Sequence, residues 1–241
     1  MCYTIEINLA KAELEKRFGV KTTKLRDFNP RYIVSAFSFP KLPVITTDDP
    51  FEFNFYQWGL IPFWIKDEKS AADIRTKTLN ARAETISEKP SFRESFKSRR
   101  CLIPAHGFFE WHELAGKKYP FYIRLKNSRA FALAGIYDNW INKETGEIIT
   151  GFSIVTAAAN PLMARIHNSK KRMPVILPED IEKEWIDPGL KEAGVKNLLK
   201  SFDENLMEAY PVAKITPSKT ESPDSAKVLE KFNYPELEGL F

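Results

Sequence analysis

Cysteine is almost absent from this sequence, which has only two, Cys2 and Cys101, among 241 residues. Two cysteines are too few for the disulfide scaffold of a small secreted domain, so the composition favours a reducing compartment and a cytoplasmic protein. No apolar run approaches the roughly 20 residues that a membrane-spanning helix needs. Glu6, Lys11 and Glu13 interrupt the start of the chain, which therefore lacks the pattern of a signal peptide. We expect no membrane contact.

Nucleotide-binding signatures are also missing. Neither GxGxxG nor the Walker pattern GxxxxGK[ST] occurs, and no segment of the chain is repeated. Strands and helices follow one another without a regular βαβ alternation. These absences argue against the doubly wound nucleotide folds.

The residues that are present indicate one globular domain. Hydrophobic residues make up 43% and charged residues 28%, and the 18 phenylalanines and 16 prolines favour strands and turns over a helical bundle. The net charge of +4 is compatible with nucleic-acid binding but does not require it. We expect the domain to cover residues 1–215. A polar tail, 216–241, is expected to dock loosely or to form part of the same domain.

Hydrophobic periodicity and capping residues predict the individual elements. Asn8 is expected to cap a helix over 9–18 that ends at Gly19, and Ser91 and Glu94 form a capping-box pattern before a second helix. Asn160 and Pro161 predict the start of a third. The expected strands are 101–114, 119–126, 131–141, 147–158 and 172–178, with a hairpin at 142–147 and later helices at 179–187 and 190–202. The fold class is therefore α+β, with a largely antiparallel, barrel-like sheet and peripheral helices.

Cys2 directly follows the initiator methionine, which is normally removed before a small residue. Its α-amine and thiol, whose pKa values in unstructured peptides are about 8 and about 8.5, both have a reactive fraction at neutral pH. The amine can condense with an aldehyde, and the thiol can then close a five-membered thiazolidine. Alternatively, the thiol can attack an acyl carbon with the amine as base. A buried structural cysteine at the start of a strand is the alternative for Cys2 alone.

The segment HGFFEWH, residues 106–112, carries the best candidate for a proton donor. In an extended strand His106, Phe108, Glu110 and His112 share one face. A carboxyl group among aromatic side chains is expected to have a raised pKa and to act as a general acid. An ordinary exposed strand face is the alternative. A metal site is disfavoured, because no further ligand that would converge with these residues is evident.

Three further segments place polar and aromatic residues in patterns that suit nucleic acid. TLNARAET (78–85) puts Asn80, Arg82 and Glu84 on one strand face, and RIHNSKKRMP (165–174) gives a histidine followed by a basic run. WGLIPFW (58–64) holds two tryptophans, of which Trp58 is expected in the core and Trp64 as a stacking platform or wedge for an unpaired strand. Basic residues near these segments would suit a passing phosphate backbone: Arg75, Lys77, Arg99, Arg100, Lys170, Lys171 and Arg172.

Taken together, these segments resemble the SRAP domain family, named for "SOS response-associated peptidase". The matching stretches are Cys2, WGLIPFW, LNARAET, RCLIPAHGFFEW and ANPLMARIHNSKKRMPVIL, in the family's order over residues 2–177. Three features depart from the family pattern. Tyr3 and Thr4 follow the cysteine in place of Gly-Arg, and the segment from His167 to Arg172 is three residues longer than the common HDRMP. The C-terminal segment has no clear match, and no functional residue is expected there.

The resemblance implies a function in the DNA damage response. It implies a barrel-like α+β fold, a positively charged groove for single-stranded DNA, and covalent capture of abasic sites by the N-terminal cysteine. The protein is then expected on the nucleoid when it is bound to DNA. The implied reaction needs no cofactor and no metal, and we expect a monomer whose partner is single-stranded DNA containing abasic sites. By matching motif, the implied site residues are Cys2 as the covalent residue, Asn80 as a hydrogen-bonding residue, Glu110 and His167 as the acid/base pair, and Arg82, Arg172, Trp64 and Lys171 as DNA-binding residues.

Competing functions remain open on the sequence. Ring opening of the abasic sugar, assisted by Glu110, would be followed by attack of the amine and ring closure by the thiol, with β-elimination as a competing lyase reaction. A thiol peptidase or autopeptidase could use Cys2 with His167 and Asn80 or Glu110, and removal of methionine could be its own reaction. An N-terminal-nucleophile amidase would use Cys2 alone. A non-covalent binder of single-stranded DNA would need only the basic and aromatic residues.

Overall fold

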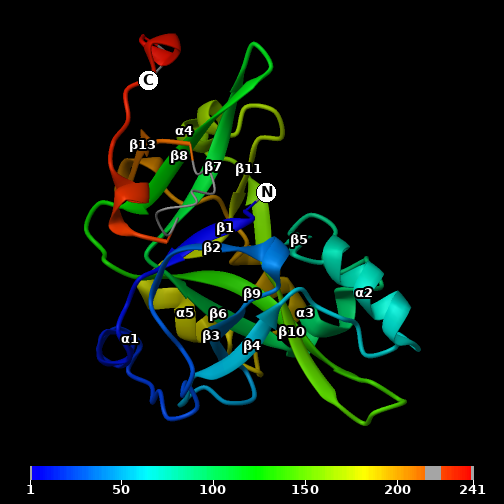
Figure 1. Ribbon diagram of the computed structural model, residues 1–241. Helices are drawn as coiled ribbons and strands as arrows, with labels where there is room; N and C mark the ends of the chain where they lie inside the picture. Colours follow the sequence, from blue (N-terminus) through cyan, green and yellow to red (C-terminus); the bar gives the residue numbers. More distant parts are fainter. Residues whose placement is uncertain (1, 215–223, 240–241) are drawn as a thin grey trace.

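A closed ring of five strands lies at the centre of the computed structural model, which describes residues 2–214 and 224–239 (Figure 1). The ring runs β3 (Lys41–Thr46), β4 (Asn54–Trp58), β10 (Ile148–Ala158), β9 (Phe131–Ile141), β6 (Arg100–Ala105) and back to β3. The pairing of β4 with β10 is parallel, and the other four pairings of the ring are antiparallel. The expected largely antiparallel, barrel-like sheet is therefore confirmed.

Two glycines allow the barrel to close where β4 meets β10. A Cβ atom on Gly151 would lie 2.4 Å from the carbonyl oxygen of Gly59, which is far too close for any side chain. The Gly59 amide donates to the carbonyl of Phe152 across the same junction, at 2.8 Å. The close approach of the two backbones therefore requires glycine at position 151.

A second, five-stranded antiparallel sheet packs beside the barrel. Its order is β13 (Met207–Pro211), β8 (Lys117–Leu125), β7 (Gly107–Leu114), β1 (Thr4–Ile7) and β2 (Arg31–Ser35). Ile5 and Phe108 from this sheet share one hydrophobic core with Val44 and Leu133 of the barrel. The two sheets therefore form a single domain.

The chain changes sheets at His106, where a single strand over 101–114 was expected. Ala105 pairs with Phe131 in the barrel, whereas Gly107 pairs with Glu6 in the second sheet. The sequence shows one uninterrupted strand-forming run, but its two halves have different neighbours. The expected strand over 172–178 is likewise two pieces, because β11 (Arg172–Pro174) pairs with β10 and β12 (Ile176–Leu177) pairs with β9.

Short helices surround the sheets. They are α1 (Lys11–Phe18), α2 (Glu68–Lys77), α3 (Arg93–Ser98), α4 (Pro161–Ile166), α5 (Glu182–Trp185) and α6 (Glu192–Asn197). The remaining short strand is β5 (Asn80–Arg82), which pairs with β10.

Two of the predicted helix caps are wrong. The N-cap of α1 is Ala10, whose amide is bound by the Glu13 carboxylate, and α3 follows Phe92 without a side-chain cap. Asn160 caps α4 as predicted, accepting from the Met163 amide at 2.8 Å. The helices expected at 179–187 and 190–202 are shorter in the structure, where they correspond to α5 and α6.

The C-terminal residues 224–239 pack against the second sheet. The Asp224 carboxylate accepts the backbone amides of Tyr32 and Ile33, at 2.7 and 3.0 Å, and so covers the outer edge of β2. Tyr234 and Leu237 join the main core. The rest of the predicted tail, 216–223, 240 and 241, lies outside the described residues. Within the described ranges no helix is long and apolar enough to span a membrane.

Candidate active site

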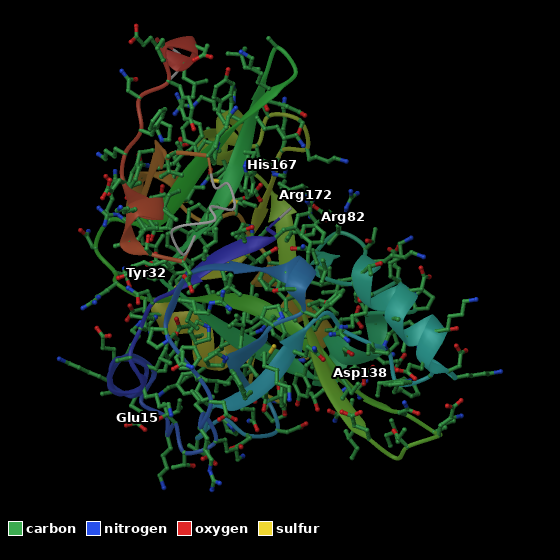
Figure 2. All side chains as sticks on the ribbon, in the orientation of Figure 1. Glu15, Tyr32, Arg82, Asp138, His167 and Arg172 are labelled. Atoms are coloured by element: carbon green, nitrogen blue, oxygen red, sulfur yellow. The ribbon has the colours of Figure 1, made fainter. Side chains whose placement is uncertain are left out.

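The candidate site lies where the beginning of the chain meets β7, β5 and the segment after α4. Cys2 lies two residues before the start of β1, which pairs with β7, and Glu110 lies on β7 one residue beyond the partner of Thr4. Asn80 and Arg82 lie on β5, and Arg172 begins β11 on the other side of β10. Figure 2 shows His167, Arg172 and Arg82 following one another in one region of the molecule, away from Glu15 and Asp138.

Cys2 is fully buried, and its backbone is fixed by Asn80. The Asn80 side chain donates from Nδ2 to the Cys2 carbonyl at 2.9 Å, while its buried Oδ1 accepts no hydrogen bond from any described residue. Burial raises the pKa of the Cys2 thiol, and ionisation of the neighbouring Glu110 raises it further. The thiol is therefore protonated at neutral pH. Met1 lies outside the described residues, so its predicted removal stays a prediction.

Glu110 and His167 lie next to each other and are both buried. The Glu110 Oε2 atom is 3.8 Å from Nδ1 of His167, and the two side chains are 3% and 9% exposed. Burial raises the pKa of Glu110 to about 8, so this carboxyl group is mostly protonated at pH 7. Burial lowers the pKa of His167, so its imidazole is mostly neutral there. The pair therefore contains an acid with a proton to donate and a base able to accept one.

The tautomer of His167 follows from its neighbour. Its Nδ1 lies 2.9 Å from the carbonyl oxygen of Arg172, and a carbonyl can only accept. Nδ1 of the neutral ring therefore carries the proton, and Nε2 is the basic nitrogen. The longer segment from His167 to Arg172 forms a turn in which the Lys171 amide donates to the His167 carbonyl at 2.8 Å. Lys171 has a φ of +50° in this turn, and Arg172 still pairs with Ala158 in β11.

The two arginines differ in their surroundings. Arg82 is exposed. The side chain of Arg172 is 11% exposed, and it donates to the Glu84 carboxylate and, at 2.6 Å, to the carbonyl of Thr156. Arg82 can contact a passing phosphate directly, whereas Arg172 would first exchange its contact with Glu84.

A cavity of about 500 Å³ opens beside the pair Glu110 and His167. Its other walls include three residues that the motifs did not predict as site residues, Tyr3, Phe37 and Lys118. Lys118 gives no sequence signal, and Phe37 is far from every quoted motif. Trp64 is 45% exposed and lies outside this lining, as does Lys171.

Other residues of these segments have partners elsewhere in the fold. Nδ1 of His112 donates to the carbonyl of Arg165 at 2.9 Å, and Nδ1 of His106 lies 3.2 Å from Glu6. The described residues contain no group of three or more metal-ligating side chains. Arg100 is fully buried and donates to backbone carbonyls, including that of Trp185 at 2.6 Å, so it cannot reach a phosphate. Trp58 is fully buried, as expected.

Comparison with known proteins supports the resemblance. A model of the family described as "SOS response associated peptidase (SRAP)" matches residues 1–217. The Abasic site processing protein YoqW of Bacillus subtilis is 43% identical over 201 residues, covering 82% of this chain and 86% of its own length. The Abasic site processing protein HMCES of Xenopus tropicalis is 32% identical over 66% of this chain and 50% of its own length.

Solved structures show the same fold. A crystal structure of a protein from Bacteroides thetaiotaomicron superposes with a TM-score of 0.91 and is 39% identical, covering 96% of this chain and all of its own. A protein from Bordetella bronchiseptica, 23% identical, superposes with a TM-score of 0.75 over 88% of this chain and supports the fold alone.

Proposed function

Because this chain belongs to the SOS response associated peptidase (SRAP) family, we propose that it captures abasic sites in single-stranded DNA as a covalent thiazolidine. One observation carries the proposal. A carboxyl group that is protonated at neutral pH, Glu110, and a neutral histidine, His167, lie together at a cavity that is also lined by Tyr3, the residue after the buried Cys2. Relatives that cover most of this chain are named abasic site processing proteins, which supports abasic sites as the substrate.

The proposed reaction begins with the sugar. An abasic deoxyribose is mostly a closed hemiacetal, and protonation of its ring oxygen by Glu110 assists opening to the aldehyde. His167, with a basic Nε2, takes up and returns protons during the following additions. The unused Oδ1 of Asn80 offers an acceptor beside Cys2 for a hydroxyl group of the opened sugar.

Cys2 then acts in two steps once Met1 has been removed. Its α-amine adds to the aldehyde carbon, and loss of one water gives an imine. The sulfur adds to the imine carbon while the thiol proton passes to the nitrogen, which closes the thiazolidine. A thiol that is protonated at neutral pH suits this order, because the amine attacks first. It suits a thiol peptidase less, since the nucleophile there is a thiolate with a lowered pKa. β-Elimination from the imine would cut the strand and compete with ring closure.

Arg82 and Arg172 would hold phosphates on either side of β10, and Trp64 and Lys171 would contact DNA farther from the cavity. The proposal therefore assigns the covalent chemistry to buried residues and strand binding to more exposed ones. Non-covalent binding of single-stranded DNA is then the first step of the same reaction.

Intact mass spectrometry tests the proposal. Wild-type protein without Met1, mixed with a single-stranded oligonucleotide containing one abasic site, should gain the mass of the oligonucleotide minus one water. The adduct should survive heating and resist borohydride, which reduces an imine but not a thiazolidine. Cys2→Ala keeps the α-amine but lacks the thiol, so it should form no stable adduct and should cleave the strand by β-elimination instead. Cys101→Ala, which removes the other buried thiol, should form the adduct normally. No heat-stable adduct with the wild type would refute the proposal.

A further inference from the structure

Two aromatic side chains from separate segments pack against each other, with tilted rings, beside the candidate site. The ring centroids of Tyr3 and Phe37 are 4.9 Å apart, with an angle of 37° between the ring planes. Both rings line the cavity that also contains Glu110 and His167. Tyr3 follows the reactive cysteine directly, at a position where the family pattern has glycine. The proposed acid/base chemistry uses neither ring.

Phe37 is exposed although its backbone is held firmly. It lies in a short 3₁₀ helix, Ala36–Ser38, between β2 and β3. The Ala36 amide donates to the Tyr3 carbonyl at 2.8 Å, and the Ser38 hydroxyl donates to the carbonyl of Ser35 at the same distance. Phe37 nevertheless leaves 64% of its surface in solvent. The turn therefore presents one face of a phenyl ring in a fixed position beside the residue that follows Cys2.

The remaining walls of the cavity suit a nucleotide. Trp111 adds a third aromatic side chain, and Lys118 and Lys170 add two cations, against one further carboxylate, that of Glu113. Lys118 is only loosely paired, 3.9 Å from Glu113, and its side chain is 67% exposed. Any of the four nucleobases can stack on an aromatic ring, because each has a π-face. A nearby cation can bind the phosphate of the same nucleotide.

We propose that the adjacent rings of Tyr3 and Phe37 form a subsite for the nucleobase next to the abasic nucleotide, with Lys118 and Lys170 binding its phosphate. This inference rests on the proposed function, because it places the abasic sugar beside Glu110 and His167 in this cavity, which Tyr3 lines and next to which Cys2 is buried. The subsite selects DNA in which the neighbouring base is unpaired and free to stack. It thereby favours single strands over duplexes without reading the base sequence.

The test uses the full chain and a non-reactive probe. One single-stranded oligonucleotide contains a tetrahydrofuran abasic analogue, which cannot form an imine. A second contains three consecutive analogues, so that both neighbouring bases are missing while the number of phosphates is unchanged. Fluorescence anisotropy at one salt concentration gives the two dissociation constants. Stacking of one base predicts that wild-type protein binds the first oligonucleotide about tenfold more tightly.

Substitutions at Phe37 decide whether that preference comes from the rings. Phe37→Ala should bind the two oligonucleotides equally, and Phe37→Trp should retain the preference. The matched control is Phe51→Ala, which removes another exposed phenyl ring, 78% in solvent and outside this cavity, and should keep the wild-type preference. Circular dichroism checks that each variant is folded.

Several outcomes would overturn the inference. They are equal affinity of the wild type for the two oligonucleotides, no binding to either, and a preference that survives in Phe37→Ala. Displacement of the oligonucleotide by a short phenylalanine-containing peptide from the wild type, but not from Phe37→Ala, would assign the rings to a peptide side chain instead. Because the probe cannot react, these results are independent of adduct formation, which alone decides the proposed function.

Discussion

Two buried carboxyl groups lie on neighbouring strands, each beside a histidine, and only one of them faces a cavity. Glu110 on β7 lies 3.8 Å from His167, and Glu6 on β1 lies 3.2 Å from His106. The residue that pairs with Glu6 across the sheet is Gly107 of β7. Both carboxyl groups are almost completely removed from solvent. By burial and histidine contact alone, the two sites would look equally reactive.

The neighbours of the two carboxyl groups differ. The Tyr122 hydroxyl donates to Glu6, and the ring of Tyr122 reaches it only because position 107 has no side chain. A Cβ atom on Gly107 would lie 2.4 Å from that ring. Glu6 is thus surrounded by protein, whereas Glu110 lines the cavity of about 500 Å³. Access to a cavity, and not burial, therefore distinguishes the proposed catalytic carboxyl group of Glu110 from that of Glu6.

The largest expected effect separates the two carboxyl groups directly. Glu110→Gln removes the proton donor and should slow adduct formation about 10²- to 10⁴-fold, the usual contribution of general acid catalysis. Glu6→Gln should destabilise the protein yet leave the rate for folded molecules within about threefold, because Glu6 has no access to the sugar. Single-turnover formation of the adduct, followed on denaturing gels, measures both rates. Equal losses in the two variants would contradict the distinction between the sites.

The pH dependence sharpens the assignment of Glu110. Because the pKa of Glu110 is raised to about 8, its acid form predominates at neutral pH and is lost as the pH rises above 8. The reactive free base of the α-amine, with an ordinary pKa of about 8, increases over the same range and then saturates. The rate should therefore pass through a maximum at about pH 8 and fall by about tenfold per pH unit well above it. In Glu110→Gln the descending limb should be absent, and its persistence would show that another group supplies the proton.

Much of this arrangement could be predicted from the sequence, but for different reasons in different places. The range of β9 and the Asn160 cap of α4 follow from local pattern, and both agree with the structure. The change of sheet at His106 could not be predicted, because strand periodicity does not show which partner a strand has. For the same reason Arg100 was grouped with phosphate-binding residues, although the fold directs its guanidinium to buried carbonyls.

Some site residues could be identified from the sequence, and others only from the folded structure. Cys2 and Glu110 were singled out by their chemistry, and the family motifs gave them partners. Phe37 and Lys118 were missed because only the folded chain brings them to Tyr3 and Glu110. Glu6 attracted no attention as a reactive group, and the structure explains its burial through Tyr122, a residue from another strand.

A smaller effect concerns the closed carboxyl group. Tyr122→Phe removes the hydroxyl that donates to Glu6 and should lower the free energy of unfolding by about 1–3 kcal/mol, since a buried acceptor loses its partner. Urea denaturation measures the loss. The rate of adduct formation by the folded variant should match the wild type. A slower rate with unchanged stability would mean that the Glu6 site contributes to the chemistry after all.

The smallest expected effect distinguishes the two arginines by the salt dependence of binding. Arg82→Gln should weaken binding of a single-stranded oligonucleotide a few-fold and reduce the slope of log Kd against log salt concentration by about 0.7, as expected for one lost phosphate contact. Glu84→Gln should instead strengthen binding and increase the slope, because it removes a negative charge and releases the Arg172 guanidinium for a phosphate. Lys24→Gln, which removes a cation already paired with Asp49, should leave the slope unchanged. Weaker binding by Glu84→Gln would show that the ion pair with Glu84 positions Arg172 for DNA and does not compete with it.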